Sequence, residues 1–132
     1  MNQAKQISAW VVSNEGQTAW LAVSNQSESP VYEVILTLVA FQGAGDSIGI
    51  NTPDEFRAYL SVLPTGKYYA KTMGNRGMMF HASVAISFID SSGVNWLREG
   101  DGSLYKINQK PVEYYNLSRP LIWDYPLEKM KI

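Results

Sequence analysis

The sequence predicts a mostly antiparallel β domain in which two sheets pack face to face. Apolar residues recur at every second position, turn-forming residues interrupt this pattern about every eight to twelve residues, and no long helical pattern is visible. A strand with one apolar face must bury that face against another layer, and a second sheet is a common solution. A small barrel is the alternative architecture.

Length and composition favour a single globular domain. The chain has 132 residues, of which 45% are hydrophobic and 17% are charged. A domain of this length buries roughly two-thirds of the unfolded surface, so its core needs neither a metal nor a disulfide. Because the chain has no cysteine, a disulfide framework, a thiolate metal site and a cysteine nucleophile are excluded. The net charge of −1 argues against a nucleic-acid partner, and no apolar run is long enough to span a bilayer.

The first two strands are expected over residues 6–13 and 18–25. Residues 14–16, Asn-Glu-Gly, form the turn between them, since Asn and Gly accept the positive φ of tight turns. In the second strand, alternate residues beginning with Ala19 form one face and those beginning with Trp20 form the other. The two strands therefore predict a hairpin.

The third strand is the longest and is expected over residues 31–41. Its even-numbered residues, beginning with Tyr32, are predicted on one face, and its odd-numbered residues, beginning with Glu33, on the other. The second face becomes apolar toward the end of the strand. We therefore expect that end to be covered on both sides.

The second half of the sandwich is expected to contain shorter strands. Residues 53–57 precede them and predict a helical turn, with Thr52 as N-cap and acidic residues over the first turn. Proline, glycine and aspartate then mark turns between segments of alternating polarity. The predicted strands are 59–63, 67–73, 81–90, 94–99 and 103–107.

From residue 108 onward the alternation stops. Pro111, Pro120 and Pro126 exclude a central strand, because proline donates no ladder hydrogen bond. This tail, residues 108–132, is too apolar for a solvated linker. We expect it to dock on its own sandwich, covering an edge or face; contact with another subunit or protein is the alternative.

Three stretches of the chain together resemble a known family. They are residues 7–12, residues 23–34, where Asn-x-Ser runs into Pro-Val-Tyr, and residues 88–104, where Phe-x-Asp-x-x-Gly-x-x-Trp-x-Arg precedes Gly-x-Leu. This combination resembles the uncharacterised immunoglobulin-like domains of actinobacterial proteins, which often follow an N-terminal membrane helix. The turn at residues 63–66, Leu-Pro-Thr-Gly, departs from the double-proline form of those domains.

The resemblance implies an antiparallel immunoglobulin-like β-sandwich of about seven or eight strands over residues 5–107. It also implies that the chain is the soluble part of a longer, membrane-anchored protein. It brings no catalytic or ligand-binding residue, because the motifs are those of turns and strands.

No enzyme active site and no cofactor or metal site are expected. The only histidine, His81, opens a predicted core strand, where a structural histidine is the commoner case. The carboxylates lie mostly in turns and form no cluster with the spacing of metal ligands. A hydrolase with an unrecognised pair of carboxylates is the least favoured hypothesis.

The tryptophan and arginine side chains of the strands could form a ligand-binding surface or belong to the core. Trp96 and Arg98 share one strand face, so they could form a stacking surface for a ligand. A core tryptophan covered by the arginine stem is the favoured interpretation. Trp10 and Trp20, on consecutive strands, are likewise expected in the core rather than on a lectin-like platform.

The sequence therefore predicts a non-catalytic structural or protein-interaction domain. A protein partner, or self-association through the C-terminal tail, is the expected interaction. The alternative is a carbohydrate- or small-ligand-binding β module that uses exposed Trp and Tyr. The candidate partner contacts are Tyr114, Tyr115, Trp123, Tyr125, Trp96 and Arg98.

Overall fold

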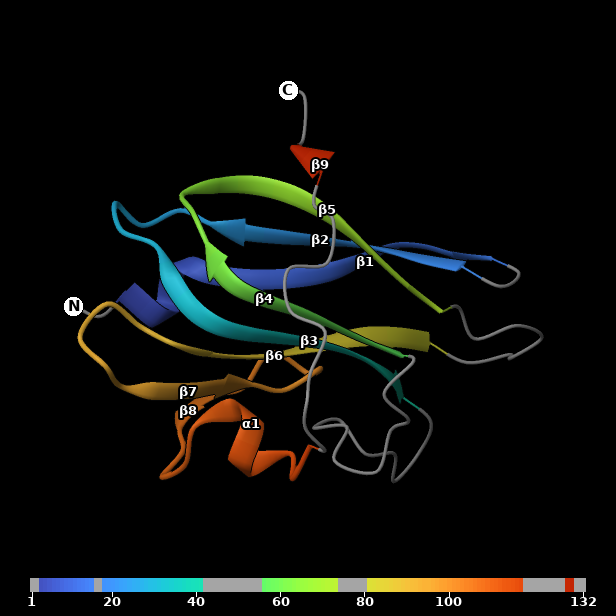
Figure 1. The fold of residues 1–132 in the computed structure, drawn as a ribbon. Coiled ribbons are helices and arrows are strands. Elements are labelled where there is room, and N and C mark those ends of the chain that lie inside the picture. The colour runs from blue at the N-terminus through green and yellow to red at the C-terminus, as the bar shows by residue number, and fades with distance from the viewer. Residues whose placement is uncertain (1–2, 16–17, 42–55, 74–80, 118–127, 130–132) are drawn as a thin grey trace.

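The computed structural model describes residues 3–15, 18–41, 56–73, 81–117 and 128–129. Strands dominate this part of the chain (Figure 1). The elements in chain order are η1 (a 3-10 helix, Gln3–Gln6), β1 (Ile7–Glu15), β2 (Thr18–Asn25), β3 (Val31–Phe41), β4 (Arg57–Leu63), β5 (Gly66–Met73), β6 (His81–Ile89), β7 (Asn95–Arg98), β8 (Leu104–Lys106), α1 (Pro111–Tyr114) and β9 (Glu128–Lys129).

The strands form two separate antiparallel sheets, as the sequence predicts for a sandwich. Sheet A has the strand order β1-β2-β5-β9, and sheet B has the order β4-β3-β6-β7-β8. Each predicted strand is present, with its ends within two residues of the expected ones. The predicted helical turn at residues 53–57 lies mostly outside the described residues, and Arg57 begins β4.

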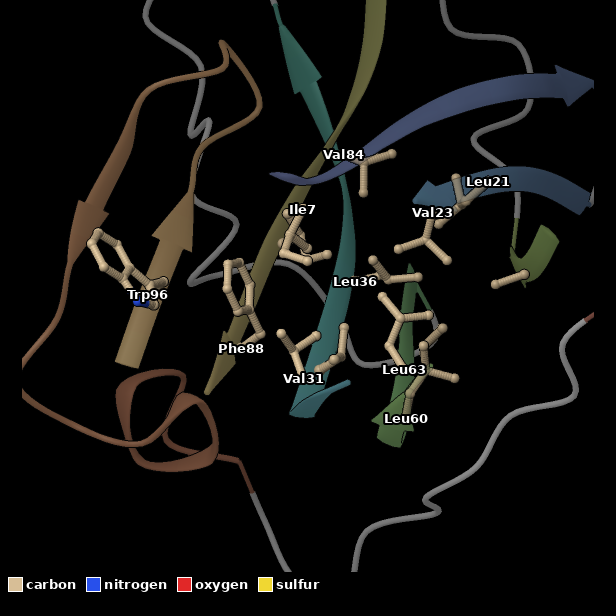
Figure 2. Close-up of a cluster of buried hydrophobic side chains, with 14 of the residues drawn as sticks. Ile7, Leu21, Val23, Val31, Leu36, Leu60, Leu63, Val84, Phe88 and Trp96 are labelled. Carbon is tan, nitrogen blue, oxygen red and sulfur yellow. The ribbon is translucent and has the colours of Figure 1, made fainter. Parts of the chain in front are cut away.

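The core lies between the two sheets and is built mainly from alternate residues of the strands. Ala19, Leu21 and Val23 of β2 face it from sheet A and are fully buried. From sheet B, Ile86 and Phe88 of β6 are fully buried in the same cluster. Figure 2 shows Leu21, Val23 and Phe88 of this cluster between the strands, with Trp96 beside Phe88 at one end. Burying each large apolar side chain contributes about 1.5–3 kcal/mol, so this cluster dominates stability.

A β-bulge interrupts the alternation of β3. Glu33 has a φ of 49°, and the register between β3 and β6 shifts between Tyr32 and Ile35. Val31 and Val34 consequently both face the core, while Tyr32 is 40% exposed. The prediction that Tyr32 shares the face of Val34 is therefore wrong, because an extra residue reverses the alternation before it.

Trp10 and Trp20 lie on the outer face of sheet A, so the expectation that both belong to the core is wrong. Trp10 is 42% exposed and is the cross-strand partner of Ala22. Trp20 lies between Ala19 and Leu21, whose side chains occupy the opposite, core-facing side of β2. Both tryptophans are therefore available at the surface of the sandwich.

The outer face of sheet B is covered by the first part of the tail (Figure 1). Proline at the start of α1 suits the helix, because its missing N–H would have no intrahelical partner there. A second buried cluster joins this segment to the sheet, and its members are Ile35, Tyr59, Leu97, Val112 and Tyr115. Farther along the chain, β9 pairs with the edge of β5.

Replacing Tyr115 with alanine tests this second cluster. Tyr115 is 3% exposed. Its truncation should lower the free energy of unfolding by about 3–5 kcal/mol, because a large buried aromatic is lost. Tyr32, the exposed tyrosine of β3, is the control. Tyr32→Ala should lower the free energy of unfolding by at most about 1 kcal/mol. Urea denaturation followed by fluorescence measures both; equal, small losses would show that α1 does not pack as described.

Candidate functional site

The carboxylate of Asp90 organises the turn between β6 and β7. Its Oδ1 accepts hydrogen bonds from the backbone N–H groups of Ser92 (2.9 Å) and Val94 (3.0 Å), and its Oδ2 accepts one from Trp96 Nε1 (2.8 Å). Asp90 is only 6% exposed. In the turn itself, Gly93 adopts a φ of 85°, which few other residues tolerate. Asp90 therefore fixes both the hairpin and the orientation of the indole.

Arg98 bridges the two sides of the sandwich. Its Nε donates to the carbonyl oxygen of Ile7 in β1 (3.1 Å), and its Nη1 donates to that of Gly102 (2.9 Å). Its Nη2 lies 3.5 Å from the carbonyl oxygen of Ala4 in η1. Burial lowers the pKa of the Arg98 guanidinium, and the three carbonyl contacts compensate its partial loss of water.

Trp96 and Arg98 thus engage other parts of the same chain. Trp96 is 7% exposed and belongs to the core cluster, and its only polar atom is bonded to Asp90. Lys106 Nζ, from the neighbouring strand β8, lies 5.8 Å from the centre of the Trp96 ring. The arrangement gives these two predicted ligand contacts intramolecular roles.

The two described aromatic residues of the tail, Tyr114 and Tyr115, pack edge to face. Their ring centroids are 5.5 Å apart, and the planes of the two rings are nearly perpendicular, at 88°. The guanidinium carbon of Arg57 lies 4.8 Å from the centre of the Tyr115 ring, in cation–π geometry. Trp123 and Tyr125, also predicted as partner contacts, lie outside the described residues.

Tyr105 connects β8 to α1. Burial is the largest cause of the raised pKa of its hydroxyl, and interactions with Glu99 and Tyr114 raise it further. The phenol is therefore neutral at physiological pH and can donate a hydrogen bond to a carboxylate. The hydrogen bond between the side chains of Tyr105 and Glu99 thus lies beside the second buried cluster.

The Asn-x-Ser motif fixes the connection between β2 and β3. Asn25 is fully buried, and its Nδ2 donates to the carbonyl oxygens of Ser29 (2.9 Å) and Leu63 (3.1 Å). Its Oδ1 accepts a hydrogen bond from the backbone N–H of Ser27 (2.9 Å). Asn25 therefore ties this connection to the end of β4.

Three aromatic side chains lie close together on the outer face of sheet A. We call the surface formed by Trp10, Val12, Trp20 and Tyr69 the aromatic face. Two of its members, Trp10 and Val12, are 42% and 49% exposed. The small residue Ala22 is the cross-strand partner of both Trp10 and Tyr69 and is fully buried between them. The larger side chains on the neighbouring strands therefore leave no accessible surface on Ala22.

An open pocket of about 270 Å³ lies on the aromatic face, lined by Val12, Ser13, Trp20 and Tyr69. The ring centroids of Trp20 and Tyr69 are 6.4 Å apart, and the planes of the two rings are nearly perpendicular, at 85°. Lys71 Nζ lies 5.4 Å from the centre of the Trp20 ring and therefore places a positive charge beside the pocket. Contiguous apolar surface beside polar groups is typical of a binding site.

Sequence reasoning missed this face because hydrophobicity alone does not distinguish the two sides of a strand. A signal was available in β2, where Trp20 alternates with the small residues Ala22 and Ser24, while the other side carries Leu21 and Val23. Leu21 and Val23 are the larger branched residues that fill cores, so their side of β2 faces the second sheet and Trp20 lies on the side that faces away from it. The bulge at Val12 was not predictable from this pattern.

Within the described part of the chain, no group of three or more His, Cys, Asp or Glu residues is arranged to hold a metal ion. His81 is the first residue of β6, and its side chain lies outside the described structure. Among the helices of the described residues, none has the length and apolar character needed to cross a membrane.

Asp90→Asn tests the structural role of the buried carboxylate. The amide keeps the size of the side chain but turns an NH₂ group toward the indole N–H of Trp96, so the unfolding free energy should fall by about 1–3 kcal/mol. Asp101→Asn is the matched control, because Asp101 is an exposed turn residue that accepts a hydrogen bond from the backbone N–H of Ser103. Thermal denaturation should show a lower midpoint for Asp90→Asn alone; unchanged stability would contradict this role.

Comparisons with protein-family models, with curated proteins and with solved structures find no match to this chain. The geometry of its own residues therefore carries the functional conclusion.

Proposed function

We propose that the chain is a non-catalytic, immunoglobulin-like interaction domain that binds a partner protein through its aromatic face. The observation that carries this proposal is the exposure of Trp10 and Val12 beside the pocket lined by Trp20 and Tyr69. Tryptophan and tyrosine contribute most of the binding energy at many protein interfaces, because they bury a large area with few rotatable bonds. Such residues on one sheet face form a suitable centre for an interface.

The strand order supports the immunoglobulin-like part of the proposal. In sheet A, β1, β2 and β5 are neighbours in the order of strands A, B and E of an immunoglobulin domain. In sheet B, β3, β6 and β7 are neighbours in the order of strands C, F and G. The motifs at Asn25 and at Asp90 to Arg98, on which the family resemblance rests, lie in the turns and strands of this arrangement.

The intramolecular roles of the polar residues support the non-catalytic part. Asp90, Arg98 and Asn25 each bond to backbone or indole groups of their own chain. A catalytic side chain must instead reach a substrate, with its reactive atom directed into an accessible site. These contacts make the three residues parts of the scaffold.

Ring geometry favours a protein partner over a saccharide on the aromatic face. Trp20 and Tyr69 are perpendicular, and Lys71 lies over the Trp20 ring, so the two rings do not make one flat platform. Sugar rings stack best on coplanar aromatic surfaces. Perpendicular rings beside a pocket are better suited to interlocking side chains, since protein interfaces reach the packing density of protein interiors.

The described part of the C-terminal tail contributes less to this proposal than the sequence suggested. Tyr115 is 3% exposed and belongs to the buried cluster on sheet B. A side chain that already stabilises its own domain is not available as the centre of an interface. The proposed partner surface therefore lies on sheet A.

Trp10→Ala and Trp20→Ala test the proposed interface. Partner proteins would be captured from native extract on the immobilised chain, purified, and titrated by calorimetry. Each variant should weaken binding by about tenfold or more, because loss of an interface tryptophan typically exceeds 1.4 kcal/mol. The free variants should keep their far-ultraviolet spectra.

Tyr32→Ala is the matched control, because Tyr32 is a similarly exposed aromatic residue, at 40%, on sheet B. It should bind the partner like the unaltered chain. Wild-type affinity in both tryptophan variants, or a loss confined to Tyr32→Ala, would contradict an interface on sheet A.

A further inference from the structure

A second pocket, of about 330 Å³, lies at one end of the sandwich. It is an open depression bordered by η1, by the connection between β2 and β3, and by the turn between β6 and β7; Figure 1 shows these segments at the end marked N. We call it the polar pocket, because amide, hydroxyl and carboxylate side chains line it. It is separate from the aromatic face, with which it shares no lining residue.

The floor of the polar pocket is held in place by Gln3. Its Nε2 donates to Ser27 Oγ (2.8 Å) and to the carbonyl oxygen of Ser29 (2.7 Å). Its Oε1 accepts hydrogen bonds from the backbone N–H of Ser91 (2.8 Å) and from Ser91 Oγ (2.9 Å). One amide thus joins the three segments around the pocket. Such a floor is formed before a ligand arrives, which reduces the entropy lost on binding.

The rim of the polar pocket carries three exposed polar side chains. The backbone N–H of Gln26 donates to the carbonyl oxygen of Gln6 (3.0 Å), which holds these two residues side by side, and Glu28 follows in the same connection. Within the described residues, the side chains of Gln6, Gln26 and Glu28 form no hydrogen bond or ion pair. Their donors and acceptors are available to a ligand.

The chemistry of these groups selects the class of ligand. Among the described residues that line the pocket, there is no Lys or Arg to balance an anion and no large apolar side chain to shelter a hydrophobic ligand. A single carboxylate, Glu28, is too few for a divalent cation, which takes six or more oxygen ligands. Amides both donate and accept hydrogen bonds, as do the hydroxyl groups of a sugar, and a carboxylate accepts from two adjacent hydroxyls.

We propose that the polar pocket binds a neutral saccharide unit through the side chains of Gln6, Gln26 and Glu28. The volume of about 330 Å³ lies at the lower end of small-molecule sites, which suits one sugar ring. This activity goes beyond the proposed protein interface and does not depend on it. The chain would then carry two recognition sites, one on a sheet face and one at a loop end.

Nuclear magnetic resonance titration of the whole, ¹⁵N-labelled chain tests the proposal. The probes are glucose, galactose, mannose and N-acetylglucosamine. At least one should shift the backbone signals of residues 26–29 and Ser91 and the side-chain amides of Gln6 and Gln26. Gln26→Ala and Glu28→Ala should each weaken that binding by about tenfold, since each removes hydrogen bonds to the ligand.

Gln109→Ala is the matched control, because Gln109 is an exposed glutamine outside the pocket. It should bind like the unaltered chain, and so should Trp10→Ala, which separates this site from the aromatic face. The proposal is overturned if none of the four sugars shifts the signals, if the shifts map to Trp10 and Trp20, or if the pocket variants bind as well as Gln109→Ala. Binding of a lysine peptide at Glu28 with no response to sugars would also overturn it.

Discussion

Paired polar groups along β7 hold the hairpin of sheet B and connect it to η1 and β1. Trp96 Nε1 donates to Asp90 at 2.8 Å, and Arg98 donates to the carbonyl oxygen of Ile7 at 3.1 Å. A buried polar group left without a partner destabilises a protein by about 1–3 kcal/mol, so these hydrogen bonds lower the cost of placing polar groups beside the core. The hydrogen bonds that Asp90 accepts fix the β6–β7 turn, and this turn places the Ser91 N–H within hydrogen-bond distance of Gln3. The polar pocket therefore depends on the carboxylate of Asp90.

The two sheets use their outer faces differently. On sheet B, Val112 and Tyr115 cover Ile35 and Leu97, so this face contributes to stability. On sheet A, Trp10 and Val12 are 42% and 49% exposed, and the proposed partner surface lies there. The division is consistent with a sandwich whose second face, rather than its loops alone, serves in recognition, since large apolar residues gathered at a surface are typical of interaction sites.

The sandwich was predictable from the sequence because the pleat of a strand imposes a period of two, which the core-facing residues of β2 and β6 follow. The face of Tyr32 was not predictable, because the bulge places Glu33 at a φ of 49°, and glutamate gives no signal for that conformation. The aromatic face was missed because a tryptophan suits either side of a sheet. Whether Tyr115 meets its own sheet or a partner depends on tertiary contacts that composition does not encode.

The central claim is that the polar motif residues hold the scaffold while the aromatic face stays accessible. Hydrogen exchange of the tryptophan indole N–H groups, followed by nuclear magnetic resonance, tests it most directly. The Trp96 indole, buried and bonded to Asp90, should exchange orders of magnitude more slowly than that of Trp10, because exchange then requires extensive unfolding. Equal, rapid exchange of the two indoles would contradict the account.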